Sequence, residues 1–163
     1  MKISKKMEIA INKQIAAEFF SAYLYLAMSG WFESENWKGC AHWMTKQANE
    51  EVAHAMKFFH FIVSRGGTVE LSAIPKPKDV WKHPLDAFSD AYAHEIEVTE
   101  MINGLVNTAK KEGDTATGSF LNWYVDEQVE EEEHAAEIVA SLEKISESKN
   151  GLFMLDHQLG KRE

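Results

Sequence analysis

The sequence has a single cysteine, few prolines and no long apolar run. Cys40, standing alone, excludes an internal disulfide framework and any Cys-x-x-Cys site, and its isolation is typical of a reducing compartment. The first seven residues carry three lysines and no apolar stretch. We therefore expect neither a signal peptide nor a transmembrane span, and we expect a cytoplasmic location.

Positive charge is also scarce. Seventeen Lys and Arg residues face 26 Asp and Glu residues, which gives a formal net charge of -9 and a pI near 5.3. This balance argues against nucleic acid or an anionic membrane as a partner and favours an interaction with cations. The 163 residues, 45% of them hydrophobic, are enough to bury one core, so we expect one domain over residues 1–163.

Helical periodicity dominates the chain and predicts an all-α fold. The first apolar stripe includes Ile11, Ile15, Ala22 and Leu26. Asn36 is the expected N-cap of the second helix. Gly113 and Asp114 mark a tight reversal before the fourth helix. We expect a bundle over about residues 4–147 and a short C-terminal helix. The expected helices are about Ser4–Glu33, Trp37–Arg65, Leu85–Glu112, a fourth from the reversal to about Glu147, and Leu152–Leu159.

The segment from Gly66 to Pro84 contains all three prolines and reads as a connection. At roughly 3.3 Å per residue it can reach about 60 Å. The second helix, at roughly 1.5 Å per residue, is only about 40 Å long. The connection can therefore run back along the bundle, which predicts a four-helix bundle with a long crossover between parallel second and third helices.

Every apolar stripe is interrupted by a carboxylate at a position that should face the core. These residues are Glu18 on the first helix, Glu51 on the second, Glu95 on the third and Glu131 on the fourth. His54 follows Glu51 by three residues, so both project from the same face. Carboxylates meeting in a dry core repel one another unless cations neutralise them.

The pattern therefore predicts a metal site. A lone Glu from each of two helices and Glu-x-x-His from the other two is the ligand set of di-iron carboxylate bundles. Carboxylates and imidazole without thiolate favour Fe(II) or Mn(II) over structural zinc. Tyr25 borders the first stripe and should point towards this site.

These residues stand in motifs that make the whole chain similar to the prokaryotic non-haem ferritins. The motifs are Glu18 followed by Ser-Ala-Tyr-Leu-Tyr-Leu, Glu50-Glu51-x-x-His54-Ala-Met-Lys-Phe, Tyr-x-His94-Glu95, and Phe-Leu-x-Trp-Tyr-Val-x-Glu-Gln-Val-Glu-Glu-Glu ending at Glu132. The resemblance implies an iron-storage cage of two dozen subunits around a ferric mineral, with the short C-terminal helix near the fourfold axis. It also implies ferroxidase activity, with Fe(II) oxidised by O2 or H2O2.

The resemblance further implies the iron ligands. One iron would be held by Glu18, Glu51 and His54, and the other by Glu51, Glu95 and Glu131 with Gln128 beside them. Glu50, Glu127 and Glu130 match the positions of a third iron site in related ferritins. A further hypothesis is that Tyr25 donates a hydrogen bond to the bridge between the irons, or donates an electron.

The role of His134 stays open. By spacing alone, Glu131-x-x-His134 is the counterpart of Glu51-x-x-His54 and would give the second iron a nitrogen ligand, as in bacterioferritin. The non-haem ferritin pattern uses Gln128 there, and we favour that interpretation. Bacterioferritin also carries haem on a methionine after the second-helix Glu, where this chain has Val52, so we expect no haem.

Two other function classes are weighed against storage. A soluble di-iron oxidase or peroxidase of the rubrerythrin or bacterioferritin kind would share the bundle, although a rubredoxin module cannot be built with one cysteine. A purely structural bundle would leave the four core carboxylates unexplained.

Overall fold

The computed structural model describes residues 2–145 and 148–163. It contains five helices, α1 (Lys5–Ser34), α2 (Lys38–Ser64), α3 (Pro84–Glu112), α4 (Thr115–Ile145) and α5 (Lys149–Leu159), and no strand in its described part. The expected end of the fourth helix at Glu147 lies outside the described residues. None of the described helices combines the length and the apolar character needed to cross a lipid bilayer.

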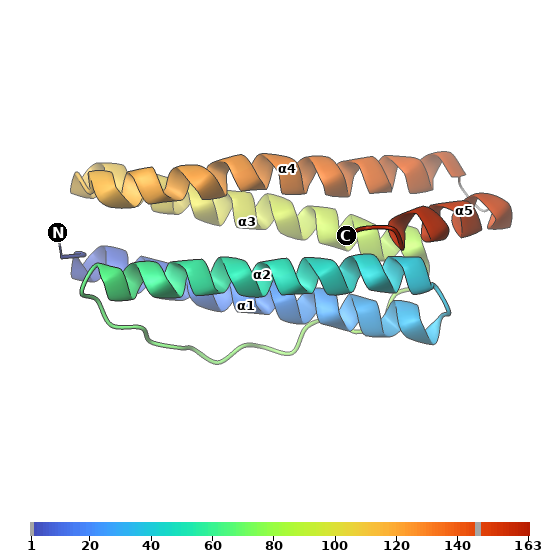
Figure 1. Cartoon of the computed structure of the whole chain (residues 1–163), viewed down its shortest axis with the longest axis horizontal. Helices are drawn as coiled ribbons and strands as arrows, with labels where there is room; N and C mark the ends of the chain where they lie inside the picture. Colours follow the sequence, from blue (N-terminus) through green and yellow to red (C-terminus); the bar gives the residue numbers. More distant parts are fainter. Residues whose placement is uncertain (1, 146–147) are drawn as a thin grey trace.

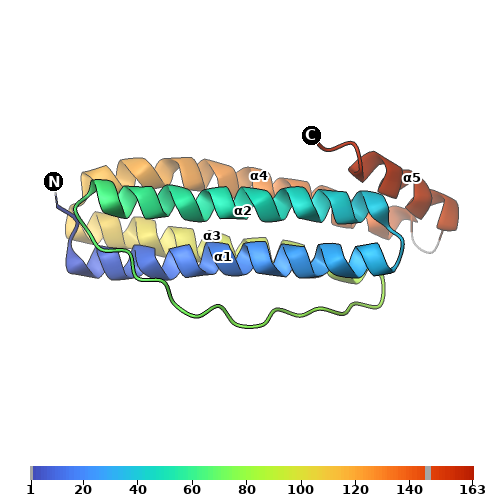
Figure 2. The same cartoon turned by 60° about the horizontal axis from the view of Figure 1, so that its bottom comes forward.

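The four long helices form one bundle in which α1 packs on α2 and α3 packs on α4 (Figure 1). The connection between α2 and α3 runs back along the outside of the bundle, so that these two helices are parallel (Figure 2). The predicted long-crossover bundle with a short C-terminal helix is confirmed. Pro84 is the first residue of α3 rather than part of the connection, and the His83 imidazole caps that helix by accepting from the Leu85 N–H.

Most helix ends follow local signals. Gly66 and Gly113 adopt left-handed backbone angles, with φ of 66° and 65°, where α2 and α3 stop. Asp114 caps α4 by accepting a 3.1 Å hydrogen bond from the Thr117 N–H. The predicted N-cap role of Asn36 is wrong. Asn36 has φ of 62° in the tight turn after α1, a conformation that Asn tolerates better than most residues, and Trp37 precedes α2 without a side-chain cap.

The N-terminus of α2 is capped from the other end of the chain. A carboxylate oxygen of Asp156 on α5 accepts from the Cys40 N–H at 2.9 Å, which satisfies a backbone donor that has no partner inside its own helix. The two helices meet so closely that a Cβ at Gly39 would stand 1.6 Å from the Asp156 carbonyl oxygen. α5 also begins earlier than predicted, because Ser148 caps it at Gly151 N.

The apolar core consists of two clusters separated along the bundle. One contains Met28, Met44 and Phe88, and the other contains Ile11, Phe58 and Ile102. Leu26, predicted to continue the first stripe, is 49% exposed, and Tyr25 is buried instead. At 3.6 residues per turn the inward positions after Glu18 fall at Ala22 and Tyr25, so a further step of four residues rotates Leu26 out of the core.

Candidate metal centre

A polar layer lies between the two apolar clusters, and it is built from the predicted residues. Glu18 comes from α1, Glu51 and His54 from α2, Glu95 from α3 and Glu131 from α4. Each of these residues is at most 5% exposed. Four carboxylates and one imidazole thus converge in the interior of the bundle.

The side chains are close enough to share a cation. Glu18, Glu51 and His54 each bring one ligand atom within 4.8 Å of the other two, and so do His54, Glu127 and Glu131. His54 Nδ1 is 3.4 Å from Glu51 Oε2, and its Nε2 is 3.8 Å from Glu127 Oε1. The first group matches the ligand set expected for one iron. His54 also belongs to the second group, and this combination of His54 with Glu127 and Glu131 was not expected.

Glu95 belongs to neither group within the part of the chain that the structure describes. Its two carboxylate oxygens accept hydrogen bonds from the Tyr25 hydroxyl and, at 3.2 Å, from the Gln128 amide. Both donors therefore contact the site through Glu95, which is the residue that α3 contributes. Glu51, Glu95 and Glu131 as the ligands of a second iron remain a prediction.

Two buried amides that the sequence reasoning gave no role complete the layer. Gln14 donates to Glu18 at 2.8 Å, and Gln47 donates to Glu131 at 2.7 Å and to Glu51 at 3.3 Å. Each glutamine precedes a site glutamate by four residues, which places both on one helix face. The repeated Gln-x-x-x-Glu spacing was the signal that could have identified them.

Burial is the main cause of raised pKa values in this layer. It raises the pKa of Glu18, Glu51 and Glu95, and the charges of Glu95 and Glu131 add to the effect at Glu51. For Glu131, burial and then the charge of Glu95 raise the pKa to about 7. Ionising the whole group without a cation is therefore unfavourable, and divalent cations would relieve the repulsion.

Tyr25 is held as a neutral donor. Burial raises its pKa well above the ordinary value, and the charge of Glu95 adds to this. The ring of His94 packs edge-on against it at 6.3 Å, and His94 Nε2 is 2.7 Å from the Ser21 hydroxyl. Burial also lowers the pKa of His94, which favours a neutral ring packed against Tyr25.

The residues expected at a third iron site lie nearer the surface and are not gathered into one group. Glu127 is half-buried beside His54, whereas Glu50 pairs with Arg162 and Glu130 is exposed. His134 is exposed as well. The rotation of α4 that buries Gln128 and Glu131 turns His134 outward, and this favours the glutamine interpretation of the fourth helix.

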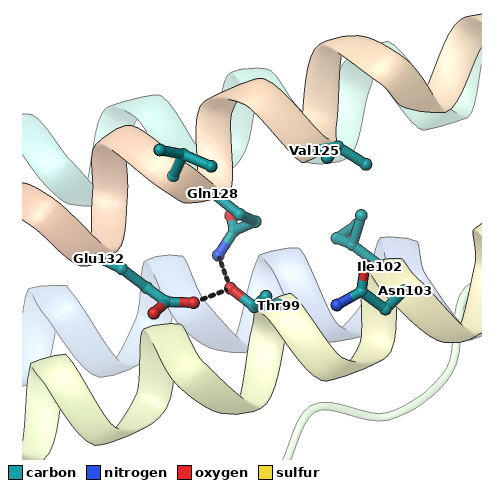
Figure 3. A pocket seen from close by; sticks show the side chains of 7 residues that line it. Thr99, Ile102, Asn103, Val125, Gln128 and Glu132 are labelled. Carbon is teal, nitrogen blue, oxygen red and sulfur yellow. Dashed lines mark hydrogen bonds between the residues drawn. The ribbon is translucent and has the colours of Figure 1, made fainter.

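A groove of about 320 Å³ between α3 and α4 leads to the edge of the site (Figure 3). Its polar lining includes Gln128, Thr99 and Glu132, and the Thr99 hydroxyl donates to Glu132. The Gln128 amide reaches Thr99 at 3.3 Å and Glu95 at 3.2 Å. The Gln128 side chain therefore lines the groove and also contacts the buried carboxylate of Glu95.

Known proteins share both the fold and the length of this chain. A model of the ferritin-like domain matches residues 9–145. Bacterial non-heme ferritin of Bacteroides fragilis is 42% identical over 160 residues, which cover 98% of this chain and 99% of that protein. The protein of the same name from Staphylococcus aureus is 36% identical over 160 residues, covering 98% and 96%.

Among solved structures, an open pore ferritin from the hyperthermophilic archaeon Archaeoglobus fulgidus superposes with a TM-score of 0.99 at 49% identity, covering 99% of this chain and 100% of that one. The helix order and the buried carboxylates thus define a bundle of the ferritin-like class. The chain belongs to the ferritin family, among its prokaryotic non-haem members. Iron storage and ferroxidase activity are the general functions of that family.

Proposed function

We propose that this chain is an iron-storage subunit that oxidises Fe(II) at the buried layer of carboxylates. The observation that carries the proposal is the grouping of Glu18, Glu51 and His54, whose ligand atoms lie within 4.8 Å of one another inside the bundle. These are hard oxygen ligands with one imidazole, which suit iron. The family membership supports the same conclusion.

The proposed reaction takes two Fe(II) ions and O2 as substrates. Each Fe(II) gives up one electron, and O2 accepts the two electrons with two protons to form H2O2, which can itself serve as an oxidant. Glu18, Glu51 and His54 hold one ion, and Glu51, Glu95 and Glu131 hold the other. The anionic oxygens make oxidation favourable because they stabilise Fe(III) more than Fe(II).

Neighbouring side chains position these ligands. Tyr25 donates to Glu95, and its raised pKa keeps the proton on the hydroxyl, so it fixes one oxygen of that carboxylate. Gln128 fixes the other oxygen. Glu50, Glu127 and Glu130 would take Fe(III) towards the mineral as a third site.

Storage requires a closed assembly, which we propose to be a cage of 24 copies in the cytoplasm. α5 supports assembly because Phe153 and Met154 are 71% and 72% exposed on a short helix, an arrangement that leaves apolar surface for another subunit to cover. The net charge of -9 suits a compartment that collects cations.

Stopped-flow oxidation with two Fe(II) per subunit tests the proposal. Glu51→Gln keeps the size of the side chain but removes the charge shared by both ions, so we expect the fast phase to slow by at least about 100-fold, or roughly 2.7 kcal/mol. Glu130→Gln and His134→Ala alter exposed residues of α4 and should stay within about threefold of the unmodified protein. Equal fast phases in Glu51→Gln and the unmodified protein would exclude the assignment.

A further inference from the structure

The described C-terminal segment folds back from α5 onto α2, where the chain end is marked in Figure 1. Arg162 makes the principal contacts. Its Nη2 lies 2.5 Å from Glu50 Oε2, and its Nη1 donates to Gln47 Oε1 at 2.8 Å. The guanidinium lies 4.5 Å from the centre of the Trp43 ring, and the Arg162 carbonyl accepts from His42 Nε2 at 2.7 Å.

These contacts hold the segment that follows α5 against α2. Glu50 and Gln47 lie three residues apart on one face of α2, and the planar guanidinium spans both with separate N–H groups. The Arg162 side chain is 20% exposed and the Glu50 side chain is 45% exposed, so the ion pair is shielded from water mainly on the arginine side.

Arg162 is also connected to the candidate iron site. Gln47 is fully buried, and the Nε2 of the same amide donates to Glu51 and Glu131. Because arginine has donors and no acceptor, it can contact only Oε1 of the amide and so directs Nε2 towards the carboxylates. The charge of Glu50 contributes to the raised pKa of Glu131, which shows that Glu50 lies within electrostatic reach of the site.

We propose that Arg162 is a built-in cation that gates Glu50, and that a divalent cation must displace it in order to bind there. This inference rests on the proposed function, because it concerns cations that approach the iron site. The guanidinium and a metal ion compete for the same carboxylate oxygen, and the positive charge of Arg162 also repels the arriving ion. By reciprocity, a cation bound at Glu50 releases the C-terminal segment from α2.

Calorimetric titration of the whole, iron-free protein with Zn²⁺, which has no redox chemistry, tests the gate. Arg162→Gln should tighten the zinc binding that depends on Glu50 by about tenfold, since that ion no longer has to displace a charge. Lys161→Gln makes the same charge change at an exposed neighbour and should alter the binding less than twofold. Arg162→Lys keeps the charge and should stay within about threefold of the unmodified protein.

The same titrations in a Glu50→Gln background separate direct competition from general loosening of α5. The gain from Arg162→Gln should disappear when Glu50 cannot pair with either cation. A gain that persists in the Glu50→Gln background, or no gain at all, overturns the proposal.

Hydrogen exchange gives a second reading in the unmodified protein. Saturating zinc should speed exchange at residues 159–163, and unchanged protection there contradicts the gate. A different result would contradict the proposed function. The unmodified protein should bind two zinc ions at the carboxylate layer, and Glu51→Gln should abolish that binding; absence of this pattern counts against the proposed function and not against the gate.

Discussion

Replacing Glu131 with Gln should make the metal-free protein markedly less sensitive to pH. Burial and the charge of Glu95 raise the pKa of this carboxyl from an ordinary value of 4.5 to about 7. Near pH 4 the carboxyl group is protonated in both the folded and the unfolded chain, so its burial does not lower the free energy of unfolding through ionisation. Between about pH 4.5 and 7 the unfolded chain loses the proton while the folded protein keeps it, so the free energy of unfolding falls as the pH rises.

The size of the effect follows from the shift. Each pKa unit corresponds to about 1.36 kcal/mol, so the contribution of Glu131 to the free energy of unfolding should fall by about 2.5 kcal/mol between pH 5 and pH 8. Glutamine has no proton to lose and fills the same volume. The difference in stability between Glu131→Gln and the unmodified protein should therefore grow by that amount, with the variant the more stable at pH 8. Relief of the charge repulsion on Glu51 acts in the same direction.

Urea unfolding of the chelator-treated protein, followed by tryptophan fluorescence at pH 5, 6, 7 and 8, measures this difference. Glu130→Gln is the matched control, because it makes the same chemical change one residue away at an exposed position. Parallel pH dependences in the Glu131 variant and the unmodified protein would refute the reasoning. They would mean that Glu131 is already ionised in the folded protein near pH 5.

Two further predictions concern α5 and assembly. Gly39→Ala places a methyl group against the Asp156 backbone, so α5 should detach from α2 and the amides of residues 149–159 should exchange hydrogen faster. Gly30→Ala is the control, because a Cβ there meets no atom within 4 Å. It should stabilise α1 by about 0.5–1 kcal/mol and leave α5 unaffected. Light scattering should show a particle close to 24 subunits in mass, and a stable monomer or dimer after iron loading would contradict the storage cage and favour a small di-iron oxidase.

Local patterns were sufficient for the helices and for the identity of the inward-facing carboxylates. Glu18, Glu51, Glu95 and Glu131 each occupy an inward position of a regular stripe, and a helix fixes which residues share a face. The long crossover was predictable because the proline-containing connection can span the bundle and a short loop cannot. The errors at Leu26 and Asn36 arose where one residue decides which way a side chain or a turn is directed.

Other features were decided only when distant segments met. The outward direction of His134 depends on how α4 is rotated against α3, which the spacing of Glu131 and His134 cannot fix. The Asp156 cap on α2 and the Arg162 contacts join positions more than 110 residues apart in the sequence. No local period relates such residues, because their contacts depend on where α5 docks, and that docking is set by the packing of the whole bundle.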